Sequence, residues 1–220
     1  ATQETTMPEP ASASSAIFGP MLRAFTWLYD TWRSKSKETL EERRRAYAQH
    51  FEPAYKRLET IHANYLTSFQ KFYDLCRKFE TPPLDLLSQF RQYGMEYTTW
   101  REDLRNFALV SKELAKGFKK ADEKAAIEEF RQALLDYFSV TIASGESHHW
   151  PSWFSHFIGS FEEHVREGRS PWDDDYAVTG VADPKGTFIK RLRAAYETEL
   201  PAKWSKVSAA KAQLQIVFNK

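Results

Sequence analysis

The feature of this sequence that most constrains its fold is a heptad repeat of large side chains between residues 83 and 118. One series recurs every seven positions: Leu86, Tyr93, Trp100, Phe107 and Leu114. A second series follows four residues behind it: Phe90, Tyr97, Leu104, Ser111 and Phe118. Alternating steps of four and three are typical of a helix that lays an apolar seam against a partner helix. At about 1.5 Å rise per residue, this helix would be roughly 50 Å long.

The segment before this repeat carries a matching seam. Between residue 36 and about residue 80 the same spacing recurs in Leu40, Tyr47, Phe51, Ala54, Leu58, Ile61, Tyr65, Ser68, Phe72, Leu75 and Phe79. Thr81-Pro82-Pro83 then ends the helix, because the residue before a proline avoids helical backbone angles. So short a connection predicts a long antiparallel hairpin over residues 36–118. Pro53 lies inside its first helix and predicts a kink or a restart near residues 51–54.

Shorter helices are predicted in the rest of the chain, over residues 121–143, 151–167 and 187–218, with a kink or restart at Pro201. Residues 168–186 between the last two read as one long loop. Aromatic residues make up 15% of the chain and only 8 residues are glycine, which favours helices packed through bulky side chains over a turn-rich β fold. We therefore expect an all-α protein, an elongated antiparallel helical bundle over residues 35–220 built on two long heptad-patterned helices.

Residues 1–34 differ in composition from this bundle. Residues 1–15 are rich in Thr, Ser, Ala and Pro without an apolar period, and they predict a disordered arm. Residues 16–34 predict a short amphipathic helix that is too short for an ordinary membrane span of about 20 residues. Two interpretations of this helix stay open: it caps the bundle, or it lies on a membrane surface with Trp27 and Trp32 at headgroup depth.

Charge and cysteine content exclude few classes of protein. The net charge of +1 gives no overall attraction to nucleic acid or to anionic lipid. From Lys185 to Lys220, however, eight basic residues face two acidic ones, a pattern that fits either phosphate contacts or the solvated face of a helix. The single cysteine, Cys76, excludes an intramolecular disulfide and is expected to be a small, half-buried core residue. A cytoplasmic location, with or without membrane association, is compatible with this content.

One short motif points to catalysis. Arg45-Ala-Tyr-Ala-Gln-His50 has an Arg-x4-His spacing that resembles the ribonuclease motif of the HEPN family, which is all-helical. The resemblance implies that Arg45 stabilises phosphate charge and that His50 moves protons during RNA cleavage. It covers six residues, and Ala46 stands where the family usually has a polar residue.

Two clusters hold residue types that bind metals. His148 and His149 follow Glu146, and the acidic run Asp173, Asp174 and Asp175 lies in the predicted long loop. A metal site needs about three or four converging ligands, and the acidic run lacks the alternation and the central glycine of an EF-hand. These residues are therefore read as exposed or capping side chains, and no cofactor is predicted.

The leading functional hypothesis is a non-catalytic interaction or scaffold protein that self-associates or binds a protein partner. This hypothesis rests on the aromatic side chains of the two seams, which are more than one partner helix of the hairpin can cover. Further helices, of this chain or of another copy, must therefore cover the seams. The predicted interface residues are Phe25, Trp27, Trp32, Tyr93, Trp100 and Phe107. The alternatives are a membrane-surface protein that uses residues 16–32 with the basic faces, and an HEPN-like ribonuclease. Nucleic acid is a further candidate partner.

Overall fold

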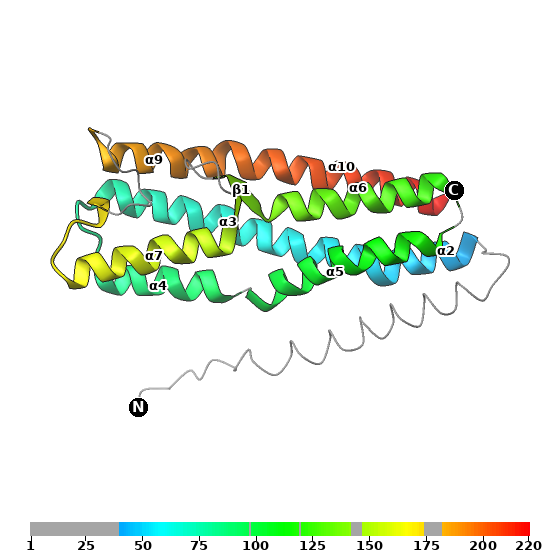
Figure 1. Ribbon diagram of the computed structural model, residues 1–220, viewed down its shortest axis with the longest axis horizontal. Coiled ribbons are helices and arrows are strands. Elements are labelled where there is room, and N and C mark those ends of the chain that lie inside the picture. Colours follow the sequence, from blue (N-terminus) through cyan, green and yellow to red (C-terminus); the bar gives the residue numbers. More distant parts are fainter. Residues whose placement is uncertain (1–39, 97, 119, 142–146, 174–181) are drawn as a thin grey trace, which may run out of the picture.

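The computed structural model describes residues 40–96, 98–118, 120–141, 147–173 and 182–220. Most of these residues are helical, and the helices lie side by side along one long axis (Figure 1). The prediction of an elongated all-α bundle is therefore confirmed. The predicted arm and helix within residues 1–34 lie outside the described residues.

The described helices form four antiparallel rods, numbered in chain order (Figure 1). Rod 1 contains α2 (Leu40–Ala46), the π-helical turn η1 (Tyr47–Phe51) and α3 (Glu52–Lys78). Rod 2 contains α4 (Leu84–Glu96) and α5 (Thr98–Gly117). Rod 3 contains α6 (Ala121–Tyr137), the strands β1 (Ser139–Thr141) and β2 (Ser147–His149), and α7 (Trp150–Arg166). After the 3-10 turn η2 (Pro171–Asp173), rod 4 contains α9 (Pro184–Ala194), the π-helical turn η3 (Ala195–Glu199) and α10 (Leu200–Asn219).

Rods 1 and 4 extend along the whole bundle, whereas rods 2 and 3 are each divided in two. In one section α5 packs against α6, and α6 packs against α10. In the other section α4 packs against α7, and α9 packs against α3 (Figure 1). We call these the α5–α6 section and the α4–α7 section. Rods 1 and 4 are the elements that join them.

The core consists of the predicted seams. On rod 1 every seam position from Tyr47 to Leu75 is buried. Phe51 packs against a ring from each of the three other helices of its section: Phe107 of α5 at 5.7 Å, Phe130 of α6 at 6.1 Å and Phe218 of α10 at 5.7 Å between ring centroids. Helices of this same chain therefore cover the seam, one of the two arrangements left open by the sequence. Cys76 is fully buried, and this burial raises the pKa of its thiol.

Each long rod contains a proline that follows a π-helical turn by two residues. The N–H of Glu52 bonds to the carbonyl of Tyr47, five residues back, and Pro53 comes next. The N–H of Leu200 bonds to the carbonyl of Ala195 in the same way, and Pro201 comes next. Proline lacks an N–H and its ring collides with the carbonyl one turn back, so a widened turn lets the helix continue. The irregularity predicted at both prolines is present as a π turn within a continuous rod.

Two predicted boundaries are wrong. The helix predicted over residues 121–143 ends at Tyr137, and the β-branched Val140 and Thr141 belong to β1, where Val140 pairs with His148 and Thr141 with Ser147. Branched side chains fit a strand better than the end of a helix. The predicted second helix of the hairpin is two helices, α4 and α5, with Tyr97 outside the described residues. The second continuous long helix is instead rod 4, where the sequence suggested a shorter one.

The ends of the α4–α7 section are closed by specific contacts. Gly168, with φ of 71°, ends α7 in the left-handed conformation that glycine adopts most easily. At the end of α3, the Trp172 indole Nε1 donates to the carbonyl of Glu80 at 2.7 Å, and Lys185 Nζ donates to the carbonyl of Phe79 at 3.2 Å. The segment predicted as one long loop thus holds the C-terminus of α3 through Trp172 and Lys185.

We expect Phe51→Ala to lower the free energy of unfolding by about 3–5 kcal/mol, because it leaves a cavity among rings from four helices. Urea denaturation followed by circular dichroism measures this change. The control is Ile216→Ala on the exposed face of α10, for which we expect about 0.5 kcal/mol or less. Equal effects of the two substitutions would contradict the proposed role of Phe51.

Candidate functional site

The structure separates the two residues of the HEPN-like motif. Arg45 leaves 65% of its side chain exposed and lies 3.9 Å from Glu41. His50 belongs to the π turn and is only 3% exposed, and burial lowers the pKa of its imidazole to about 4. A ribonuclease pair needs both side chains at one accessible surface. The described structure does not bring Arg45 and His50 together in that way.

The metal candidates are only partly visible. His148 and His149 belong to β2 and Asp173 to η2, but their side chains, and the whole of Asp174 and Asp175, lie outside the described structure. Among the described residues, no group of three or more His, Cys, Asp or Glu side chains is arranged to hold a metal ion.

The predicted interface residues have different environments. Phe25, Trp27, Trp32 and the side chain of Tyr93 lie outside the described residues. Trp100 is half-buried beneath the guanidinium of Arg57, 5.9 Å from the ring centroid. Phe107 is 3% exposed and packs on Phe51, so it belongs to the core of this chain instead of an interface.

A polar and aromatic cluster that the sequence did not reveal lies near the junction of the two sections. The ring of His62 stacks on Trp204 at 4.5 Å with an interplanar angle of 8°, and Tyr55 lies 5.3 Å from the same indole. His62 Nδ1 is 2.9 Å from the hydroxyl oxygen of Tyr137. Lys203 Nζ donates to the carbonyl of Asp136 at 2.7 Å and to the carbonyl of Ser139, where α6 ends. The cluster therefore ties α3, α6 and α10 together.

His62 and Tyr137 of this cluster are held in their neutral forms. Burial lowers the pKa of His62 to about 4 and raises that of Tyr137 well above its ordinary value. Neutral imidazole and phenol form a hydrogen bond without a buried charge, which suits a structural contact. Burial also lowers the pKa of Lys203. A general base that works near neutral pH needs a pKa closer to that pH. The cluster is therefore better suited to stabilising the fold than to transferring protons.

The two buried histidines predict a loss of stability in mild acid. Their folded pKa of about 4 lies below the ordinary 6.5, so the unfolded chain takes up protons first as the pH falls. The resulting loss of stability is absent well above pH 6.5, grows as the pH falls, and is nearly complete at pH 4. We expect each histidine to lower the free energy of unfolding by about 2 kcal/mol between pH 7 and pH 5. Urea denaturation at both pH values should show a smaller loss in His50→Leu, and an unchanged loss would refute this account.

Each section also contains a buried carboxylate. In the α5–α6 section, Glu123 of α6 pairs with Arg43 of α2 at 3.0 Å, and their side chains are 1% and 9% exposed. In the α4–α7 section, Glu162 of α7 accepts from the hydroxyl of Ser88 at 2.9 Å and from Arg91 at 3.3 Å. Buried ion pairs contribute little net stability because desolvation offsets their attraction. They do make the relative position of their helices specific.

Replacing one member of the Arg43–Glu123 pair should be costly. We expect Glu123→Ala to destabilise the fold by about 3–5 kcal/mol, because it leaves the Arg43 charge buried without its carboxylate. The double variant Arg43→Met with Glu123→Leu removes both charges and should recover most of that loss. Chemical denaturation of the wild type, the single variant and the double variant distinguishes these cases. A double variant as unstable as Glu123→Ala would show that the loss comes from packing.

Many basic residues of the C-terminal segment make contacts within the chain. Lys185 pairs with Glu80, Arg191 with Glu199 and Arg193 with Glu197. Lys211 lies 5.3 Å from the ring centroid of Tyr55. The predicted basic face is therefore partly occupied by contacts within the chain: Arg191 and Arg193 pair within rod 4, whereas Lys185 and Lys211 contact rod 1.

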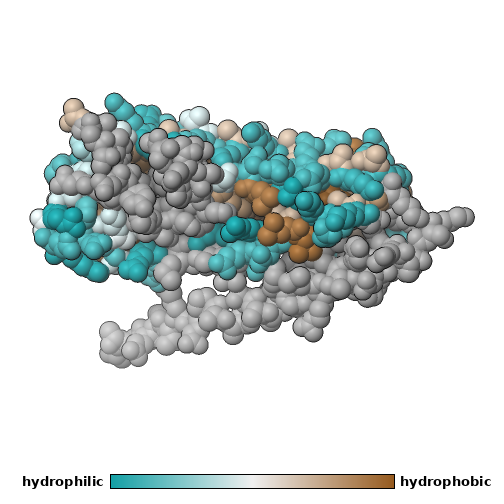
Figure 2. Space-filling view, viewed as in Figure 1, coloured by the Kyte–Doolittle hydropathy of each residue, from teal (hydrophilic) through white to brown (hydrophobic). Residues whose placement is uncertain are grey.

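Apolar surface remains on the outside of the bundle. Among the described residues, Leu109 of α5 and Ile216 of α10 are the exposed large hydrophobic side chains, at 55% and 50%. Figure 2 shows an apolar patch over α5 and α6 within a largely hydrophilic surface. Val110 and Leu135, on these two helices, are half-buried hydrophobic residues. We call the apolar surface over α5 and α6 in Figure 2 the α5–α6 patch. Leu109 occupies an outward position of the heptad register, a signal that the sequence contained and that our prediction missed.

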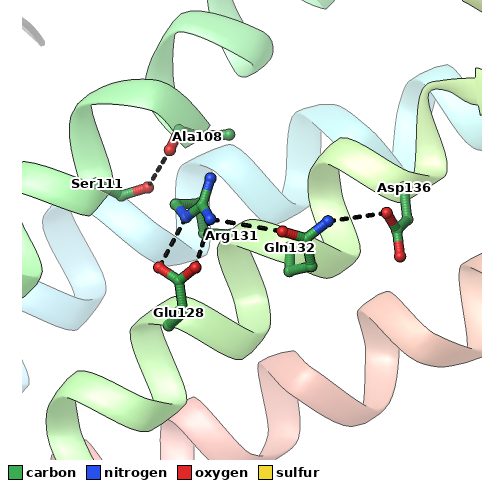
Figure 3. Close-up of polar contacts among 6 residues, drawn as sticks. All are labelled: Ala108, Ser111, Glu128, Arg131, Gln132 and Asp136. Atoms are coloured by element: carbon green, nitrogen blue, oxygen red, sulfur yellow. Dashed lines mark hydrogen bonds and ion pairs between the residues drawn. The ribbon is translucent and has the colours of Figure 1, made fainter.

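Figure 3 shows a row of polar contacts along α6, with Ala108 and Ser111 of α5 nearby. Arg131 Nε donates to Glu128 at 2.8 Å, and the Gln132 amide nitrogen donates to Asp136 at 3.0 Å. The Arg131 hydrogen bond lowers the pKa of Glu128, so the carboxylate stays charged. An apolar centre with a polar border is the usual composition of a protein–protein interface.

Comparison with known proteins adds no assignment. No protein-family model, no curated protein and no solved structure matches the chain. Within the described ranges, no helix combines the length and the apolar character needed to cross a membrane.

Proposed function

We propose that this protein is a non-catalytic helical interaction protein that associates with copies of itself through the outer surface of its bundle. The observation that supports this proposal is the apolar patch over α5 and α6 (Figure 2), together with the exposure of 55% of the Leu109 side chain on α5. The chain buries its heptad seams but leaves 55% of the Leu109 side chain exposed. Apolar surface of this kind is explained if a second molecule covers it.

The proposal changes the location of self-association that the sequence suggested. The heptad seams of rod 1 are buried against helices of the same chain, and Phe107 is among the residues that bury them. The association surface is therefore the outward face of α5 and α6, and the rigid bundle is the scaffold that presents it.

Size-exclusion chromatography with light scattering tests this proposal. We expect the full chain to form a dimer or larger species as its concentration rises from about 1 to 200 μM, a range that reveals weak as well as strong association. A chain lacking residues 1–34 should behave in the same way. A monomer at every concentration would reject self-association. Association that disappears with residues 1–34 would place it at Phe25, Trp27 and Trp32 instead of the bundle.

A further inference from the structure

We infer that the outer face of α5 pairs antiparallel with the same face of a second copy, about a twofold axis that passes beside Leu109. This inference rests on the proposed self-association and names its surface, its occupant and its register. The face consists of seven exposed residues: Glu102, Arg105, Asn106, Leu109, Lys112, Glu113 and Lys116. None of them contributes to the buried core.

The exposed residues of α5 form one stripe. Positions 102, 105, 109, 112 and 116 alternate steps of three and four, so they lie along one side of the helix. This stripe is separate from the inner seam of α5, where Leu104, Phe107 and Ala108 are buried. Charged residues lie on both sides of Leu109, and none of the described helices buries this stripe.

The charges on this face complement each other when two copies are antiparallel. A twofold axis at Leu109 places residues opposite one another when their numbers sum to 218. Glu102 then faces Lys116 of the second copy, and Arg105 faces Glu113. The pairs recur by symmetry on the other side of the axis, as a self-complementary interface requires.

The centre of the face places no like charges opposite each other in the same register. Leu109 meets Leu109 of the second copy on the axis, and Asn106 lies opposite Lys112, so no like charges oppose each other. Among the described residues, no ion pair involves Glu102 or Arg105, so both side chains are available to a second copy. Lys116 Nζ already lies 2.7 Å from a carboxylate oxygen of Glu113 on the same helix. In the dimer each of these side chains would keep this contact and also meet its oppositely charged partner on the second copy.

The area of contact sets the expected strength. The face covers fifteen residues, about 21 Å of helix at 1.5 Å per residue. A stable interface buries about 800 Å² on each partner, and one helix face of this length, even with the neighbouring α5–α6 patch, buries less. We therefore expect a weak dimer with a dissociation constant of about 10 μM, one that weakens as salt screens its ion pairs.

Sedimentation equilibrium on the full chain, with charge-reversal variants, tests the register. We expect E102K to weaken dimerisation by about tenfold, since each substitution alters two symmetry-related pairs. K116E should weaken it similarly, and the double variant E102K/K116E should return to within about threefold of the wild type because the pairs form again with reversed sign. The matched control K206E, on the exposed face of α10, should leave the dissociation constant unchanged.

Leu109 allows a second test in the same assay. L109D should abolish the dimer, whereas I216D, at a side chain of similar exposure on α10, should not. An L109C variant should form a disulfide-linked dimer under mild oxidation, since the two residues adjoin the axis, and the native Cys76 is buried. Thermal unfolding of each variant confirms that the fold is intact.

The outcomes separate this inference from the proposed function. A wild-type monomer at every concentration rejects both. A wild-type dimer that is insensitive to L109D, or whose E102K defect K116E fails to rescue, rejects the α5 pairing and leaves self-association to another face. Loss on I216D with L109D unaffected would assign the contact to α10.

Discussion

The rest of the structure depends on the burial of one face of rod 1. Its seam supplies a continuous row of large side chains, and every other rod covers part of it. Phe51 shows how this happens, because its ring meets one ring each from α5, α6 and α10. Aromatic pairs at these distances prefer tilted and edge-to-face geometries, which fix the rotation of each helix as well as its distance. The same packing leaves the outer faces of the helices to polar residues and to the few apolar ones that carry the functional proposal.

The prolines show how continuous packing is kept where the backbone cannot follow an ideal helix. Each π turn accommodates one additional residue within a rod, so the rod passes its proline without leaving the bundle. At η1 this turn also brings His50 into the core beside Tyr47 and Phe51. A residue that looks like part of a catalytic pair in the sequence becomes a buried neutral side chain.

The sequence predicted the fold better than it predicted the candidate site. Apolar spacing decides which side of a helix is buried, so the seam positions from Tyr47 to Leu75 were found without the structure. Spacing does not reveal contacts between distant segments, and the cluster of His62, Tyr137 and Trp204 joins three helices that are remote in the chain. Local signals also compete: the strong helical pattern of α6 obscured the change at Val140, where branched residues favour a strand. Leu109 was missed for a different reason. It lies outside the inner seam of α5, and the apolar spacing that identifies buried positions does not identify an exposed one.

The division of rods 2 and 3 has a consequence for how the molecule opens. The α5–α6 section and the α4–α7 section each have their own aromatic contacts and their own buried carboxylate, Glu123 in one and Glu162 in the other. Rods 1 and 4 cross between them as continuous helices. We expect such a molecule to open in two parts, so that amide hydrogens in one section exchange with solvent while the other section stays closed. Rods 1 and 4 would then be shared by two sections that open separately. Only the α5–α6 section carries the surface proposed for association.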